Sequence, residues 1–111
     1  MRVYVPATLT ALAGFVASGE VPADDDRFVA DDESEEAEYD ALEAAAQAAA
    51  GLLEGPGRRV VVVADVPDPD AAFPTRLIAS VHADPEPVDP ASDGLPDLGW
   101  YAVQELPDLL G

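Results

Sequence analysis

Hydrophobic and polar positions over the first 20 residues follow two different periods. Residues 2–5 (RVYV) are β-branched or aromatic, and they predict a short strand that ends at Pro6, which lacks an amide hydrogen. Over residues 9–17 the apolar positions recur at helical spacing. Thr8 is placed to cap the start of this helix, and Gly19 is placed to end it in a left-handed turn. The chain therefore opens with a strand followed by an amphipathic helix.

Residues 24–40 (DDDRFVADDESEEAEYD) carry acid at a density typical of disordered tails, but their pattern predicts ordered elements. A charged turn at 24–26 precedes a short strand at 27–30. Asp32, with a glutamate three residues on, is a good helix N-cap, and the sequence that follows is rich in alanine, leucine and glutamate. It predicts a helix as far as Leu53. Much of the acid then lies near the positive end of the helix dipole, where carboxylates are favourable.

Four consecutive valines at 60–63 mark the expected centre of a β-sheet, because a strand that is apolar on both faces is typical of one covered on both sides. Residues 76–83 predict a further strand. Residues 84–98 contain four prolines and predict a loop. The segment 100–106 suits either a final strand or the start of a short helix, and Pro107 limits both choices.

These elements predict a single α+β domain over residues 1–111: a two-layer sandwich with a mixed sheet of three to five strands and two main helices. The four valines favour helices on both faces of the sheet, whereas the late strands favour both helices on one face. We expect the second arrangement. The apolar fraction of 49% is in the globular range. A chain of this length hides about two thirds of its unfolded surface, which is enough for one modest core.

The charge of the chain is strongly one-sided, with 23 acidic residues against five arginines and no lysine, for a net charge of −18. Such a surface repels phosphate groups, so we expect neither nucleic-acid binding nor docking to an anionic membrane. Two explanations stay open. The acidity keeps the protein soluble, in a salt-rich cytoplasm or as a coding bias, or it attracts a basic protein partner over long range. For the charge as a whole we favour the solubility explanation.

Several classes of chemistry are excluded by missing residue types. The chain has no cysteine, which removes disulfides, thiolate nucleophiles and cysteine metal sites. It has no lysine for a phosphate-binding loop or a Schiff base, and no glycine fingerprint of a dinucleotide site, so we expect no cofactor. Residues 1–20 fit a strand and a helix better than a signal peptide, and no run reaches the roughly 18 apolar residues that span a bilayer. We therefore expect a soluble, cytoplasmic protein.

The segments MRVYVPAT, EEAEYDALEAAA, RRVVVVADVP and WYAVQELPDLL together resemble a family of small acidic proteins from actinobacteria, the high-GC Gram-positive bacteria. The resemblance touches most of the predicted elements and is weakest over residues 67–98. That family is one of unknown function, so the resemblance implies a bacterial source and a cytoplasmic location but supplies no catalytic residues. It also argues against an extreme halophile.

The most enzyme-like group of residues is SVHAD, in which Ser80, His82 and Asp84 alternate and therefore point to one face of a strand. Their order suggests a nucleophile, a base and an orienting acid. However, side chains two apart on a strand start roughly 7 Å apart, whereas a triad needs hydrogen bonds of about 2.6 to 3.2 Å. We therefore interpret these residues as a polar strand face that leads into a turn.

A small ligand- or metal-binding site is the alternative function, and its candidates are Asp65, Asp68, Asp70 and His82. The aspartates follow the central strand, where open sheets bind ligands and where clustered carboxylates hold Mg²⁺ or Ca²⁺. The prolines between them also make this segment an ordinary turn, which is the interpretation we favour. A transition-metal site is weaker still, because one histidine cannot supply two imidazole ligands.

Three features of the chain are candidates for contact with a protein partner or a small anion. The first is a cluster of aspartates ahead of the acidic helix: Asp24, Asp25, Asp26 and Asp31. The second is the C-terminal QELPDLLG, in which Leu109 and Leu110 either dock in a groove on a partner or, as we favour, close the domain's own core. The third is the pair Arg58 and Arg59, which either clamps an anion or, as we expect, bridges to the acidic helix.

We therefore expect a small accessory or interaction module without enzymatic machinery of its own. Its acidic surface binds a basic protein partner with an affinity that falls as salt rises. The alternative is a small ligand- or metal-binding domain or an enzyme at the residues named above, which requires a pocket that joins at least two of them. A homo-oligomer formed through an open sheet edge or the leucine-rich tail is a third option.

Overall fold

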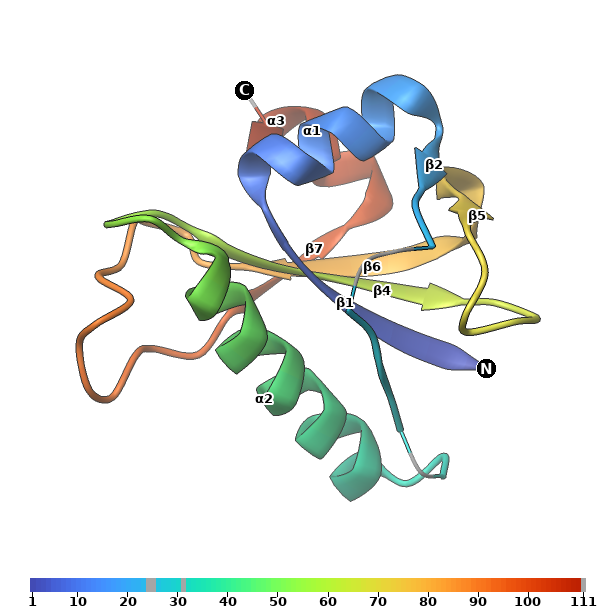
Figure 1. The fold of residues 1–111 in the computed structure, drawn as a ribbon, viewed down its shortest axis with the longest axis horizontal. Helices are drawn as coiled ribbons and strands as arrows, with labels where there is room; N and C mark the ends of the chain where they lie inside the picture. The colour runs from blue at the N-terminus through green and yellow to red at the C-terminus, as the bar shows by residue number, and fades with distance from the viewer. Residues whose placement is uncertain (24–25, 31, 111) are drawn as a thin grey trace.

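A computed structural model describes residues 1–23, 26–30 and 32–110, and its centre is an antiparallel β-sheet (Figure 1). Within these residues the main sheet has five strands in the order β3-β1-β4-β6-β7, and a second sheet pairs β2 with β5. The main strands are β1 Arg2–Thr8, β3 Phe28–Val29, β4 Arg59–Asp65, β6 Ile78–Ala83 and β7 Gly99–Ala102. The small sheet consists of β2 Glu20–Val21 and β5 Phe73–Pro74.

The helices of the described residues are α1 Leu9–Ser18, α2 Glu35–Leu52 and α3 Leu106–Leu110. Two 3₁₀ turns, η1 Thr75–Leu77 and η2 Val103–Glu105, precede β6 and α3. The C-terminal segment thus forms both a strand and a short helix, and Pro107 falls in the first turn of α3, where a missing amide hydrogen is harmless. None of the described helices is both long and apolar enough to cross a membrane. The predicted α+β class is confirmed.

The first strand is longer than predicted. β1 continues through Pro6 to Thr8 and pairs with β4 along its whole length. On its other side it pairs with β3 only at Val3 and Tyr4. Pro6 therefore has no strand neighbour on that side among the described residues, and a residue without an amide hydrogen is tolerated at such an edge position.

The caps of the two long helices follow the sequence with one difference. Thr8 Oγ1 accepts a hydrogen bond from the third helical amide of α1 at 3.1 Å, and Gly19 ends that helix with φ 79°, as predicted. The N-cap of α2 is Ser34 rather than Asp32. Ser34 Oγ accepts the third helical amide at 3.1 Å, while Asp32 accepts the Ser34 amide at 2.7 Å. Two capping residues lie two positions apart, and the aspartate forms the turn into the helix instead.

The two long helices cover opposite faces of the sheet, so the expectation that both lie on one face is wrong (Figure 1). The reason lies in β4. Val60 and Val62 belong to the core under α1, whereas Val61 and Val63 belong to the core under α2. A central strand without a polar face needs cover on both sides. The domain has three layers rather than two.

The pairings of the main sheet are all antiparallel among the described strands, where the sequence suggested a mixed sheet. β4, β6 and β7 are neighbours in the sheet and follow one another without an α-helix between them. Parallel neighbours need a long crossover connection, usually a helix, and this part of the chain supplies none.

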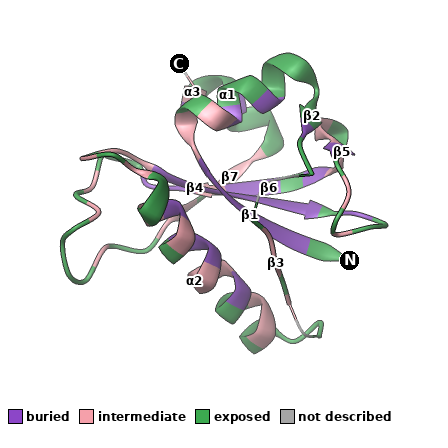
Figure 2. Cartoon of the chain, viewed as in Figure 1, coloured by how far each residue is buried: buried purple, intermediate pink, exposed green. Residues whose placement is uncertain are grey.

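The two cores differ in the size of their side chains. Under α1, Leu12 and Phe15 pack with Leu106 and Leu109 from the C-terminus, and Leu110 packs against the same cluster. Under α2, the buried helix residues are all alanines. Figure 2 shows the buried centre of the sheet and the buried stripe along α2. Helix α2 lies mainly on β1, β3 and β4. It therefore covers little of β6 and β7 on the same face of the sheet.

Candidate functional site

The α2 side of the sheet carries a row of side chains that crosses β4, β6 and β7. The strand register places Val61, His82 and Trp100 next to one another on neighbouring strands. Val61 belongs to the core under α2. Because cross-strand neighbours point to the same face, His82 and Trp100 also face the α2 layer, beside the helix.

A hollow of about 300 Å³ lies at this place, and we name it the β6–β7 hollow. Helix α2 forms one wall and the end of the long loop before β7 forms another. The lining residues are Tyr39, Leu42, Glu43 and Ala46 from α2, Arg59, His82 and Trp100 from the strands, and loop residues 95–98. The hollow therefore combines aromatic, acidic and basic groups from three parts of the chain.

The floor of this hollow rests on a buried ion pair. Arg59 Nη2 and Nε lie 2.8 and 2.9 Å from the two carboxylate oxygens of Asp84, and the side chains are only 7% and 1% exposed. The same carboxylate accepts the backbone amide of Arg59 at 2.8 Å. Arg59 Nη2 also donates to the carbonyl oxygen of Pro96 at 2.6 Å. This bidentate, charge-assisted pair ties the loop wall of the hollow to β4.

The arginine pair at the start of β4 does not bridge to the acidic helix in the described structure, contrary to our expectation. Arg59 binds Asp84, and Arg58 Nε donates to the backbone carbonyl oxygen of Asp84 at 2.6 Å. The physical reason is that the arginine pair and the acidic start of α2 lie at opposite ends of β4. The acidic start of α2 lies near the far end of β4, where Glu38 is bound by Arg2.

Two exposed aromatic side chains line the β6–β7 hollow. Tyr39 on α2 is 58% exposed and Trp100 on β7 is 61% exposed. Glu43, one helical turn after Tyr39, raises the pKa of the tyrosine through its negative charge, and Asp97 on the loop adds to this effect. The tyrosine hydroxyl therefore lies in the field of carboxylates from two walls of the hollow.

His82 lies half-buried in the hollow, and burial lowers its pKa below the usual histidine value. The imidazole is therefore neutral at pH 7. Ser80 and Asp84, which share its strand face, are both buried, and Asp84 is bound to Arg59 instead of His82. This placement agrees with the interpretation of SVHAD as a polar strand face.

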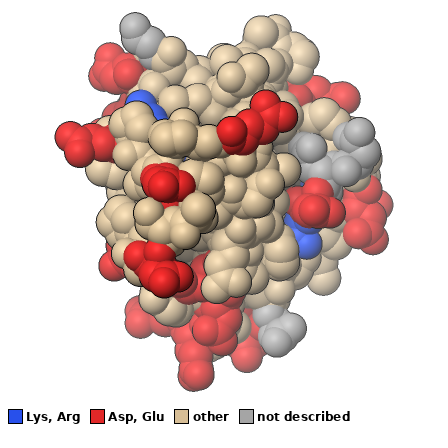
Figure 3. Space-filling model, turned by 60° about the vertical axis from the view of Figure 1, so that its left-hand side comes forward, with Lys and Arg blue, Asp and Glu red and all other residues tan. Residues whose placement is uncertain are grey.

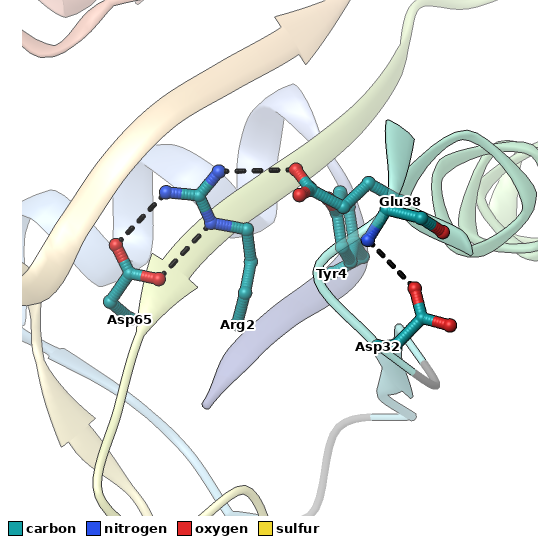
Figure 4. A network of polar contacts seen from close by, with 6 residues as sticks. Arg2, Tyr4, Asp32, Glu38 and Asp65 are labelled. Atoms are coloured by element: carbon teal, nitrogen blue, oxygen red, sulfur yellow. Dashed lines mark hydrogen bonds and ion pairs between the residues drawn. The ribbon is translucent and has the colours of Figure 1, made fainter. Parts of the chain in front are cut away.

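A second hollow, of about 560 Å³, lies at the other end of α2, and we name it the Arg2 hollow. Arg2 Nε and Nη2 each lie 3.1 Å from an oxygen of Asp65, and Nη1 lies 3.3 Å from Oε1 of Glu38 (Figure 4). Tyr4 Oη lies 3.5 Å from the same Glu38 oxygen. Hydrogen bonds from Arg2 hold the pKa of Asp65 below its usual value. The side chains of Arg2 and Asp65 remain 42% and 59% exposed.

The four residues of the alternative ligand or metal site lie apart. Asp65 lines the Arg2 hollow and His82 lines the β6–β7 hollow, so neither hollow joins two of the four. Asp68 and Asp70 are exposed, and Asp68 Oδ1 accepts the amide of Asp70 at 2.9 Å in a turn. In the part of the chain that the structure describes, no group of three or more histidine and acidic side chains is placed to hold a metal ion.

Four of the five arginines are bound internally. Arg2, Arg58 and Arg59 make the contacts described above. Arg27 donates to three backbone carbonyl oxygens at 2.6 to 2.8 Å and lies 4.9 Å from the centre of the Phe73 ring. The protein therefore uses most of its positive charge to hold its own fold.

Most of the acidic side chains that the structure describes, in contrast, form no ion pair with an arginine. The ion pairs among the described residues use three carboxylates, whereas the chain has 23. Figure 3 shows the side that carries the 84–98 loop, where acidic groups are spread widely and basic groups are few. Of the predicted partner-binding aspartates, Asp26 is exposed, and the others, Asp24, Asp25 and Asp31, lie outside the described residues.

Sequence reasoning missed four residues that give the β6–β7 hollow its chemistry: Tyr39, Glu43, Asp97 and Trp100. An aromatic residue on the polar side of the acidic helix is the signal that would have pointed to Tyr39 and its neighbour Glu43. Asp97 offers no such signal, because the place of its proline-rich loop depends on the contact between Arg59 and Pro96.

These features define a small, acidic α+β domain in which the β6–β7 hollow and the Arg2 hollow both lie beside α2. The chain belongs to DUF6912, a family of unknown function, which matches residues 1–110. The predicted membership of a family of unknown function is confirmed. No significant match is found among curated proteins or among solved structures.

Proposed function

We propose that this protein is a non-enzymatic interaction or accessory module that binds a basic segment of a protein partner. The observation that carries the proposal is the division of charge: four of the five arginines are bound by the protein's own carbonyl and carboxylate groups, while many acidic groups face solvent on the side drawn in Figure 3. Such a surface attracts positively charged segments over distance. The proposal includes a cytoplasmic location in an actinobacterium, which fits the lysine-free, acid-rich composition.

The surface charge affects mainly the rate of association and the choice of partner. At physiological ionic strength, screening limits the reach of exposed charges to about 8 Å, so the attraction depends on the salt concentration. High affinity also needs anchoring contacts. These are usually made by aromatic or arginine side chains that lose their water when the partner binds. The β6–β7 hollow, with Tyr39 and Trp100 on its lining, supplies contacts of this type.

The alternative of a ligand- or metal-binding domain or an enzyme has weaker support. It requires Asp65, Asp68, Asp70 or His82 to act together, and these residues lie in separate hollows or on an exposed turn. Asp65 is also neutralised by Arg2, which reduces its capacity to bind a cation.

Binding of defined peptides tests the proposed function. Labelled peptides of equal length, one rich in arginine and lysine, one acidic and one uncharged, are titrated with the full chain, and fluorescence anisotropy is measured. We expect the basic peptide alone to bind, with an affinity that falls at least about tenfold between about 50 mM and about 300 mM salt. Equal binding of the uncharged peptide, or an affinity that does not depend on salt, contradicts the proposal.

A further inference from the structure

The exposure of Tyr39 and Trp100 sets the β6–β7 hollow apart from the rest of the surface. Both residues are more than half exposed, although both line a concave site. Large aromatic side chains contribute most when buried, and exposed ones beside a hollow are typical of a binding surface. They come from separate elements, α2 and β7, so a group that fills the hollow lies within reach of both rings.

The charge that remains around these rings is negative. Glu43 on α2 and Asp97 on the loop before β7 both line the hollow. The one arginine of the lining, Arg59, is balanced by Asp84 at 2.8 Å and by a backbone carbonyl. His82 is neutral at pH 7 because of its burial. Two carboxylates are therefore left without a counter-charge among the described lining groups.

The rings, the carboxylates and the volume together select a ligand. A cation over an aromatic face is attracted by the ring, and a nearby carboxylate adds to that attraction. A volume of about 300 Å³ is at the lower end for ligand sites and suits one long side chain. We infer that the β6–β7 hollow receives a single arginine or lysine side chain of the partner, held by Tyr39 and Trp100 and neutralised by Glu43 and Asp97. This inference rests on the proposed function, since the basic segment supplies the cation.

Other ligands fit the hollow less well. An anion would meet Glu43 and Asp97. An apolar side chain would displace water from the same carboxylates without replacing it by a charge or a hydrogen-bond donor, and this is costly. A long basic side chain avoids both problems, because its methylene stem covers the rings while its charged end meets the carboxylates.

Tryptophan fluorescence reports on the hollow directly, because Trp100 is the only tryptophan in the chain. A basic peptide without aromatic residues is titrated into the protein, and tryptophan emission is compared with the anisotropy of the labelled peptide. We expect a saturable change in emission with the same midpoint as the anisotropy change. Binding by anisotropy with unchanged emission overturns the inference but leaves the proposed function standing. Absence of binding by both measurements overturns the proposed function.

Variants of the two aromatic residues test their role in affinity. Trp100→Ala and Tyr39→Ala should each weaken binding of the basic peptide by about 3- to 30-fold, and Trp100→Phe should lose less because an aromatic face remains. Leu52→Ala is the matched control, since Leu52 lies on the same helix as Tyr39, is 50% exposed and is outside the hollow. We expect its affinity to stay within about twofold of the parent. Equal losses in the hollow and control variants overturn the inference.

A pair of glutamates separates local from long-range charge. Glu43→Gln should weaken peptide binding by about 2- to 5-fold. Glu54→Gln removes the same charge from an exposed position just beyond α2, outside the hollow, and should weaken binding less. If both variants weaken binding equally, the surface acts through its total charge, which overturns the inference and retains the proposed function.

Discussion

Two arginine–carboxylate clusters lie at opposite ends of β4, and they differ chiefly in burial. In the β6–β7 hollow, Arg59 and Asp84 are 7% and 1% exposed. In the Arg2 hollow, Arg2 and Asp65 are 42% and 59% exposed. Both pairs are bidentate, and both join β4 to a neighbouring strand or its end. The same chemistry therefore appears once inside the protein and once at its surface.

Burial indicates that the fold depends more on the Arg59–Asp84 pair than on the Arg2–Asp65 pair. A buried pair has lost its hydration, so each charge depends on its partner, and removal of one leaves the other stranded. An exposed pair is screened by water and salt and contributes little. The buried pair also holds the loop at Pro96, which forms a wall of the β6–β7 hollow. We therefore expect the ion pair that contributes most to stability to support the candidate binding site as well.

The largest effect is expected for Asp84→Asn. This change leaves Arg59 charged and buried without a counter-ion, so the free energy of unfolding should fall by about 3–5 kcal/mol, as measured by urea denaturation. Asp65→Asn is the matched control at the exposed pair. Similar losses for the two variants would show that burial does not distinguish the clusters.

Removal of both buried charges together should be less harmful than removal of one. In the double variant Arg59→Met with Asp84→Leu no charge is stranded, and the expected loss is about 1–3 kcal/mol, because the backbone amide of Arg59 loses its acceptor. Urea denaturation of this variant beside Asp84→Asn measures the coupling. A double variant that is less stable than Asp84→Asn would contradict this account of the pair.

Acidification should lower the free energy of unfolding through His82 in the β6–β7 hollow, by less than the buried-pair variants do. Burial lowers the pKa of His82 below 6.5, so below that pH the unfolded chain binds more protons than the folded one. The contribution of His82 to stability is fully present above pH 6.5 and is lost as the pH falls below it. The other charged or titratable groups that line the hollow are Tyr39, Glu43, Arg59 and Asp97. Protonated His82 adds a cation among them, so basic-peptide binding should weaken over the same window.

His82→Gln is the control for this pH effect. Its stability and its peptide affinity should change less than those of the parent between about pH 7 and about pH 5, as followed by urea midpoints and anisotropy. An equal pH dependence in the parent and the variant would assign the effect to other groups.

The smallest effect is expected at the exposed cluster. Asp65→Asn should lower the free energy of unfolding by about 0–1 kcal/mol, and the difference should shrink at about 1 M salt. Because Arg2 lowers the pKa of Asp65, the contribution of this carboxylate is present above pH 3.8 and is lost as the pH falls below that value. Urea denaturation at two salt concentrations measures it. A loss as large as that of Asp84→Asn would reverse the comparison.

Much of the fold follows from local patterns in the sequence. The helix after β1 begins at Thr8 and ends at Gly19 as predicted, and the four valines form the centre of the sheet. Several predictions were wrong. One concerned the choice between two equally suitable cap residues, and another concerned the packing of elements that are far apart in the chain. Ser34 and Asp32 are both good caps, and the sequence around them does not rank them. The placement of the long helices depends on which valines each one covers.

The candidate site was predictable only in part. His82 was identified from its strand pattern, although its neighbours in the hollow were not. The Arg59–Asp84 pair joins residues 25 positions apart, and neither residue type predicts that the other will be its partner. Tyr39 and Trp100 are farther apart still in the chain. They share a hollow only because α2 covers the face of the sheet to which Trp100 on β7 points.

Local patterns and composition are enough to predict the α+β class, the order of the main elements, the cap residues of the first helix and the acidity of the chain. Each of these depends on residue types within a few positions or on composition alone. The folded chain is needed to learn that the helices cover opposite faces, that Arg59 binds Asp84 and that two exposed aromatic rings line one acidic hollow. These features depend on strand order and on contacts between distant segments. Local propensities do not encode them, because many pairings of the same elements satisfy the same local pattern.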